Sequence, residues 1–301
     1  MAEAVKRKKV PRQRKASANI LSPKMQNRMG FLFITPWLIG FIIFTGIPFF
    51  ATIYLSFFAV EQNIQGFATD FVGWGNYFTA LFENLEFNPG MVGYAMMIVM
   101  YTPTIVVISF ILAYFLNMKL RGRLFFRTIY FLPVIVLSGP VMHDVIDTGG
   151  AGAEIDLMDI FLFRILYYYA PFAGNLVATL FENFAILLWF TGIPIVLFIT
   201  AMQKINPSLY EAARIDSAST WQILFKITMP LIKQTVLIST IFTIAQLGMF
   251  SSINPIYDLI RTSMMNTTGG LGLASAYSLM FSLVTLLFIG IAALFLRTKN
   301  D

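Results

Sequence analysis

The sequence contains no cysteine and a single histidine, His143, and charged residues make up only 12% of its 301 positions. Without cysteine there can be no disulfide bond, thiolate metal ligand or cysteine nucleophile, and one histidine cannot form a multi-histidine metal centre. Soluble domains usually carry about a quarter charged residues. With 57% hydrophobic residues, this chain has too few charged side chains to cover its apolar surface in water. The composition predicts an integral membrane protein and excludes a soluble enzyme.

Motifs of nucleotide hydrolysis and nucleophilic catalysis are also missing. No Gly-x-x-x-x-Gly-Lys-Ser/Thr loop occurs, so the chain has no phosphate-binding loop of its own. No Ser-His-Asp set can be built around His143, which is interpreted as an interfacial histidine beside Asp144. We therefore expect no catalytic residue, no metal site and no cofactor bound by this chain.

The basic residues are concentrated at the N-terminus. Nine of the 21 Lys and Arg lie in the first 28 residues, so the net charge of +6 reflects a tail and not a patch that binds nucleic acid. Residues 1–29 are predicted to form a disordered basic cytoplasmic tail that helps to orient the first hydrophobic segment. Specific binding of this tail to anionic lipid or to nucleic acid is the alternative. A cleaved signal peptide is not expected, because the uncharged run that follows is far longer than a signal-peptide core.

Six stretches are long and apolar enough to cross the hydrocarbon core of a bilayer. They are residues 30–58, 91–118, 124–143, 176–202, 231–253 and 273–296. In this arrangement 19 of the 21 Lys and Arg fall on one side, which predicts that both termini are cytoplasmic. Residues 160–171 contain Arg164 and three consecutive tyrosines, and we expect them to lie flat at the membrane surface. The predicted fold class is an all-α integral membrane protein with six transmembrane helices, formed by residues 30–301.

The connection between the fourth and fifth stretches, at about residues 204–230, carries the most specific pattern. Asn206-Pro207, and Ser208 with Glu211 three residues later, are helix-start signals, and Ser219 with Gln222 marks a second start. The pattern predicts two short helices with a break at residues 216–218, after which Pro230 ends the second helix or opens the next span. Ala212 and Ala213 have almost no side chain, so another protein can approach this helix closely. Local capping by Glu211 and plain helix propensity of the alanines are the alternative explanations.

This loop resembles a known signature. The string Glu211-Ala212-Ala213-x-x-Asp216-x-Ala218, followed by Ile227-x-x-Pro230, is similar to the cytoplasmic signature loop of permease subunits of binding-protein-dependent ABC importers, in the class that transports maltose, oligosaccharides and glycerol phosphate. Phe71-Val72-Gly73-x-x-Asn76-Tyr77 also looks like an outer loop of that class, and the resemblance covers about residues 30–296. Ser217 stands where the family usually has glycine. We therefore expect a strained turn at Ser217 or a break shifted by one residue.

The resemblance implies the fold and partners of a type I importer permease. Separate ATP-binding cassette subunits would bind Mg-ATP and dock on the loop, and a second permease, an extracytoplasmic solute-binding protein and the bilayer would be the other partners. The chain would be a multi-pass protein of the plasma or inner membrane that forms part of a path for a sugar or oligosaccharide. The docking residues expected from the resemblance are Tyr210, Glu211, Ala212, Ala213, Asp216, Ser217, Ala218 and Pro230.

Polar residues inside the predicted spans are candidates for contacts with the solute, because intramembrane polar groups are often functional. A sugar prefers amide and carboxylate partners beside aromatic faces. The candidates are Glu182, Asn183, Trp189, Gln246, Asn254 and Ser278. Helix packing through polar residues is the alternative role for each of them. The alternative function is a stand-alone ion- or proton-coupled secondary carrier, but such a carrier needs charged relays in several helices and only Glu182 qualifies.

Overall fold

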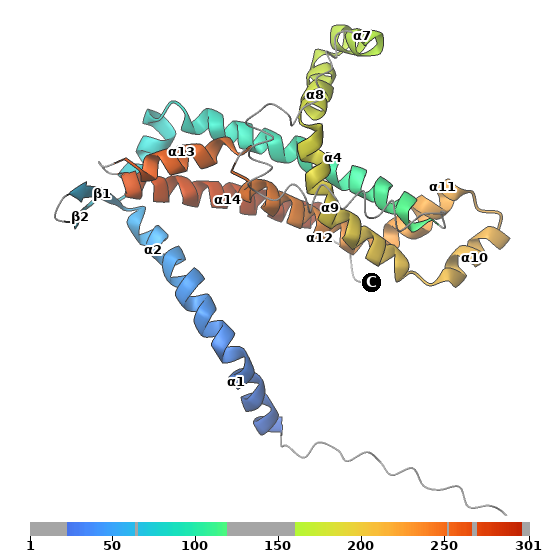
Figure 1. Cartoon of the computed structure of the whole chain (residues 1–301), viewed down its shortest axis with the longest axis horizontal. Coiled ribbons are helices and arrows are strands. Elements are labelled where there is room, and N and C mark those ends of the chain that lie inside the picture. The colour runs from blue at the N-terminus through green and yellow to red at the C-terminus, as the bar shows by residue number, and fades with distance from the viewer. Residues whose placement is uncertain (1–22, 64–65, 119–159, 252, 267–269, 297–301) are drawn as a thin grey trace, which may run out of the picture. The chain divides into compact units, whose positions relative to one another are not determined.

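The computed structural model of the chain describes residues 23–63, 66–118, 160–251, 253–266 and 270–296, and it is mostly helical (Figure 1). Five of its helices are long and apolar enough to cross a membrane. They are Arg28–Leu55, Phe87–Asn117, Ile186–Gln203, Thr220–Met249 and Gly270–Leu296. Each of these overlaps one of the six predicted stretches. The remaining prediction, residues 124–143, lies outside the described residues.

The N-terminal unit extends to Thr52 and is described by itself. Helix α1 (Pro23–Phe41) continues through a π-helical turn (Ile42–Gly46) into α2 (Ile47–Leu55), which extends beyond this unit. Pro48 has no backbone N–H, and the widened turn just before it accommodates the missing helical hydrogen bond. A helix that is apolar on all sides is typical of a membrane span.

A short β-hairpin follows this helix and corrects the all-helical prediction. Strand β1 (Phe58–Asn63) pairs with β2 (Gly66–Phe71) in antiparallel register, with Phe58 opposite Phe71. The rings of these two residues lie edge to face, with their centroids 5.3 Å apart. Strands of six residues that mix apolar and polar side chains give no signal in a search for long apolar runs.

A helical segment fastens the base of the hairpin. It consists of α3 (Gly75–Phe78) and a π-helical turn, η2 (Thr79–Glu83). Asn76 Nδ2 donates hydrogen bonds to the carbonyl oxygens of Ser56 and Phe58, both at 2.9 Å. Gly272 lies so close to the Phe58 carbonyl that a β-carbon there would overlap it. The hairpin, α3 and the start of the last helix therefore form one packed end of the bundle, which we call the hairpin end.

The bundle is built from α4 (Phe87–Asn117), α9 (Phe184–Gln203), α12 (Met229–Met249), α13 (Pro255–Met264) and α14 (Gly270–Leu296). Helix α4 packs against α9 and α12, and α14 packs against α12 and α13 (Figure 1). One buried cluster, which includes Phe87, Phe190 and Tyr277, lies toward the hairpin end. A second cluster, which includes Val106 and Phe198, lies toward the other end of the bundle. Two clusters along one bundle are expected for helices about 40 Å long.

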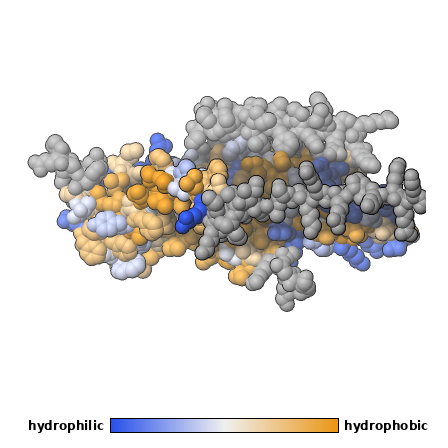
Figure 2. Space-filling view, turned by 90° about the horizontal axis from the view of Figure 1, so that it is seen from below, coloured by the Kyte–Doolittle hydropathy of each residue, from blue (hydrophilic) through white to orange (hydrophobic). Residues whose placement is uncertain are grey.

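The outward surface of the helices is apolar, as a lipid environment requires. Exposed side chains on α4 and α14 include Val99, Val107, Leu286 and Leu294. Much of the face shown in Figure 2 is hydrophobic where it is not grey.

The predicted span 176–202 is interrupted in the structure. Helix α8 (Pro171–Glu182) ends at Asn183, whose φ of −106° and ψ of 21° are not helical, and α9 starts at the next residue. Asn183 Nδ2 donates to the Thr179 carbonyl at 2.8 Å, which favours the break because the side chain competes for the backbone acceptor. Helix α7 (Phe161–Tyr169) has nine residues, about 13 Å, and is too short to span the membrane. Its orientation flat on the surface stays a prediction.

Candidate functional site

The loop between α9 and α12 forms two short helices, as the capping signals predict. Helix α10 covers Pro207–Ile215, and α11 covers Thr220–Ile223. Asn206 caps α10 by accepting a hydrogen bond from the Ser208 N–H at 3.1 Å. Ser219 and Gln222 form a reciprocal capping box, in which the Ser219 N–H donates to Gln222 Oε1 at 2.8 Å. A π-helical turn, η4 (Leu224–Thr228), then leads directly into α12, so Pro230 opens the span.

The break between α10 and α11 is a tight turn centred on Ser217. The N–H of Ser217 donates to the Arg214 carbonyl at 3.1 Å, and the N–H of Ala218 donates to the Ala213 carbonyl at 2.9 Å. This pair of bonds is a Schellman motif, which places the residue after the helix cap in the left-handed region. Ser217 has φ +56° and is the residue in that position. Of the two outcomes expected for Ser217, the structure has the strained turn and not the shifted break.

The two faces of α10 are different. On the inner face, the Tyr210 hydroxyl and Thr228 Oγ1 form a hydrogen bond of 3.3 Å that ties α10 to η4. Ala213 is on the same side and is only 8% exposed. On the outer face, Glu211 and Ala212 are exposed. Leu209 and Ile215 also expose apolar side chains there, and Ile215 is 83% exposed.

These positions revise the interpretation of two signature residues. Glu211 lies well inside α10, whose cap is Asn206, so helix capping does not explain this acid. Ala213 is buried, and its backbone carbonyl accepts the Schellman bond from the Ala218 N–H. Its side chain therefore packs within the chain, and Ala212 is the alanine that a second protein could approach. The sequence pattern treats the two alanines alike, because only the path of the turn distinguishes them.

Two of the solute-path candidates, Trp189 of α9 and Gln246 of α12, lie on helices that pack against each other. Trp189 Nε1 and Gln246 Oε1 are buried, and neither has a hydrogen-bond partner among the described residues. The Trp189 ring lies 4.8 Å from Phe250, and Phe190 lies 5.4 Å from Phe250. A buried donor and a buried acceptor without partners are costly, so such groups need an explanation. Phe250 is absent from the sequence candidates, because one Phe among 31 carries no signal.

The other solute-path candidates have local partners. Asn254 Nδ2 donates to the Gly248 carbonyl at 3.0 Å, and Asn254 Oδ1 accepts from the Ile256 N–H at 3.1 Å, so this residue caps α13. Ser278 donates to the Ala274 carbonyl at 2.8 Å within its own helix. Asn183 forms the break described above. Glu182 ends α8, and its side chain lies outside the described part of the structure.

Metal-ligating side chains do not gather in the part of the chain that the structure describes. Within those residues, no three His, Cys, Asp or Glu side chains lie together as a metal site would require.

Known proteins are similar to this chain over most of its length. It is 31% identical over 231 residues to the osmoprotective compounds uptake permease protein GgtC of Synechocystis, a match that covers 73% of this chain and 78% of the relative. It is 29% identical over 250 residues to the multiple sugar-binding transport system permease protein MsmF of Streptococcus mutans, with 81% and 82% covered. No protein-family model matches the chain.

A solved structure shares the fold. The chain aligns with a chain from the crystal structure of a bacterial alginate ABC transporter in complex with an alginate pentasaccharide-bound periplasmic protein, with a TM-score of 0.61. The alignment covers 90% of this chain and 95% of that chain at 16% sequence identity. At this low sequence identity, the match shows that the two chains share a fold.

Proposed function

Because this chain belongs to the permease subunits of sugar and oligosaccharide ABC transporters, we propose that it forms one half of the solute path of an ATP-driven importer for a sugar or oligosaccharide. ATP hydrolysis takes place on separate cassette subunits that bind Mg-ATP. A second permease completes the path, and an extracytoplasmic binding protein delivers the solute. Relatives that are permease subunits, together with several apolar helices, support a multi-pass membrane location.

The observation that carries the proposal is the exposed face of α10. Leu209, Ala212 and Ile215 present apolar surface on a short helix that projects from the bundle, and Glu211 lies beside them. A capped helix anchored through Tyr210 can transmit force, because the hydrogen bond to Thr228 and the continuous helix from Thr220 to Met249 connect it to α12. Closure of the ATPase subunits on α10 would then move α12 as a rigid body.

The solute is proposed to pass Trp189 of α9, and Gln246 and Phe250 at the end of the neighbouring helix α12. Aromatic faces stack on the apolar faces of sugar rings, and an indole N–H and an amide oxygen can exchange hydrogen bonds with hydroxyl groups. The support is that both polar atoms are buried without partners in the described residues. We omit Asn254 and Ser278 from the path because their side chains already have backbone partners.

The chain is proposed to lie with α10 and both termini in the cytoplasm. The support is that 19 of the 21 Lys and Arg fall on that side of the predicted arrangement. Because the chain has no cysteine, single cysteines test this directly. A membrane-impermeant maleimide added to intact cells should label Met265→Cys, near the hairpin end, and should not label Ile215→Cys on α10, although both positions are highly exposed. The opposite pattern would contradict the orientation.

Cross-linking tests the docking role. Ala212→Cys should form a disulfide with a cysteine placed on the groove of the co-expressed ATPase subunit that receives α10. Ala213→Cys is the matched control, because it neighbours Ala212 on the same helix but is buried. We expect a cross-link at position 212 that is at least several-fold more abundant than at position 213. Equal cross-linking at both positions, or none at either in an assembled complex, would contradict docking on this face.

A further inference from the structure

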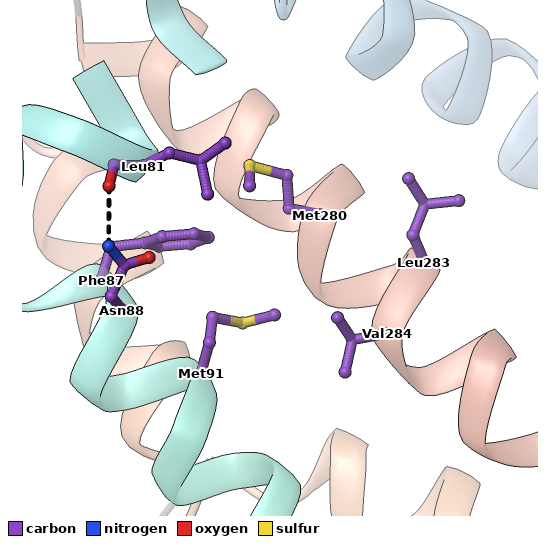
Figure 3. A pocket seen from close by; sticks show the side chains of 7 residues that line it. All are labelled: Leu81, Phe87, Asn88, Met91, Met280, Leu283 and Val284. Carbon is purple, nitrogen blue, oxygen red and sulfur yellow. Dashed lines mark hydrogen bonds between the residues drawn. The ribbon is translucent and has the colours of Figure 1, made fainter. Parts of the chain in front are cut away.

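An apolar cleft lies at the hairpin end, between the start of α4 and the middle of α14 (Figure 3). Its volume is about 360 Å³. Leu81 of η2, Phe87 and Met91 of α4, and Met280 and Val284 of α14 point into it. The polar member of its lining, Asn88, donates its amide N–H to the Leu81 carbonyl at 2.7 Å. The walls therefore offer hydrocarbon contact and suit an apolar occupant.

The depth of the cleft follows from helix geometry and rests on the proposed orientation. Met280 and Val284 precede the end of α14 at Leu296 by 16 and 12 residues, which is about 24 and 18 Å along the helix axis. The hydrocarbon core of a bilayer is about 30 Å thick. With the end of α14 at the cytoplasmic boundary, the cleft faces the outer leaflet.

An aromatic stripe lies on the segment that also supplies Leu81 to the cleft. Trp74, Phe78 and Phe82 follow at intervals of four residues and are 70%, 56% and 72% exposed. The Phe78 and Phe82 rings are 4.9 Å apart. Trp and other large amphipathic side chains gather at the boundary between lipid and water. Leu81, the neighbour of Phe82 in the sequence, lines the cleft, so the stripe begins beside it.

The charged residues next to the cleft-lining residues in the sequence are acidic. Glu83 and Glu86 are exposed and lie in the sequence between two lining residues, Leu81 and Phe87. No Lys or Arg occurs between Arg28 and Lys119, and none occurs between Arg261 and Arg297. Of the two segments that form the cleft, the first carries these acidic groups, and neither carries a Lys or Arg. An anionic headgroup would be repelled here, whereas an ammonium group can pair with the carboxylates and approach the exposed ring faces.

We propose that this cleft binds an acyl chain of an outer-leaflet phospholipid with an ammonium headgroup, of the phosphatidylethanolamine type. A hydrocarbon chain suits the apolar lining, which includes Met91 and Met280. The bound lipid would fill the gap between α4 and α14 and support the packing of the hairpin end.

Photo-cross-linking in the assembled complex tests the site. The complex is placed in nanodiscs that contain phosphatidylethanolamine with a diazirine on one acyl chain, or phosphatidylglycerol with the same modified chain. Peptide mapping should find the ethanolamine probe on the segments around Met91 and Met280, and the glycerol probe there several-fold less often. Met280→Trp fills the cleft and should reduce labelling at Met91 several-fold. The matched control is Met96→Trp, since Met96 is exposed on α4 outside the cleft, and it should leave the labelling unchanged.

Two further measurements complete the test. The double variant Glu83→Gln, Glu86→Gln should remove the preference for the ethanolamine probe while labelling persists. Met91→Trp, read out at Met280, replaces Met280→Trp if that variant fails to assemble. The proposal is overturned by equal labelling in the filled and control variants, by a preference that survives the double variant, or by a cleft that remains unlabelled because another protein covers it. None of these readouts requires transport, so such a result leaves the proposed importer function unaffected.

Discussion

The exposed position of Ala212 predicts a selective effect of a bulky substitution on ATPase binding. Ala212→Trp adds an indole ring to the outer face of α10, between the exposed side chains of Leu209 and Ile215. The ring enters solvent in the free permease, so folding should be unchanged. In the docked complex the same ring occupies space where two surfaces must close. Overpacking of this kind costs about 1 to 3 kcal/mol, which corresponds to roughly 5- to 150-fold weaker binding.

The assay compares two neighbouring variants with a distant control. Affinity of the ATPase subunit for the permease complex in nanodiscs, and the thermal unfolding temperature of that complex without ATPase, are measured for each. Ala212→Trp should lose affinity and keep its unfolding temperature. Ala213→Trp should lower both, because its side chain is buried. Met265→Trp, at the other end of the bundle, should change neither. Wild-type affinity for Ala212→Trp would refute the assignment of this face as the docking surface.

Three further predictions concern the solute path, the loop turn and the tail. Gln246→Leu should impair solute-dependent uptake without loss of thermal stability, because it removes a buried acceptor that has no partner among the described residues. Unchanged uptake would assign Gln246 to helix packing. Ser217→Gly should relieve about 1 kcal/mol of strain from the left-handed backbone conformation, and so slow hydrogen exchange of the Ala218 amide roughly fivefold. Faster exchange would contradict the claim that Ser217 is strained. Deletion of residues 2–20 should reduce the amount of inserted protein but not uptake per inserted molecule, and an inserted variant that fails to stimulate the ATPase would point to a regulatory tail.

Five of the six predicted spans coincide with long apolar helices, because a bilayer imposes a length and composition that no neighbouring element has to supply. The interruption at Asn183 was not predictable, since an asparagine inside an apolar run is compatible with both a continuous helix and a break. There the hydrogen bond from Asn183 to the Thr179 carbonyl favours the break. The hairpin at Phe58–Phe71 was also missed, because its stability depends on Asn76 and Gly272, which are distant in the sequence.

The two short helices of the loop at residues 204–230 were largely predictable, because their capping signals are local. Asn206 and the Ser219–Gln222 pair form capping hydrogen bonds with residues two or three positions away. The turn at Ser217 follows because one helix ends before it and the next begins after it. The orientation of α10 depends on its packing against η4, so the burial of Ala213 and the exposure of Ala212 required the structure. The roles of the polar solute-path candidates also could not be predicted from the sequence. Asn254 and Gln246 are equally plausible in the sequence, and only their hydrogen-bond partners separate a helix cap from an unpaired amide.

The source of energy for uptake tests the central claim most directly. The chain is reconstituted in proteoliposomes with its second permease and ATPase subunits, the solute-binding protein is added on the outer side, and uptake of labelled sugar is followed. Uptake should require internal ATP, stop when the ATPase is inactivated, and continue when a protonophore collapses the proton gradient. Uptake by the chain without the ATPase, driven by a proton or ion gradient, would contradict the account and identify a secondary carrier.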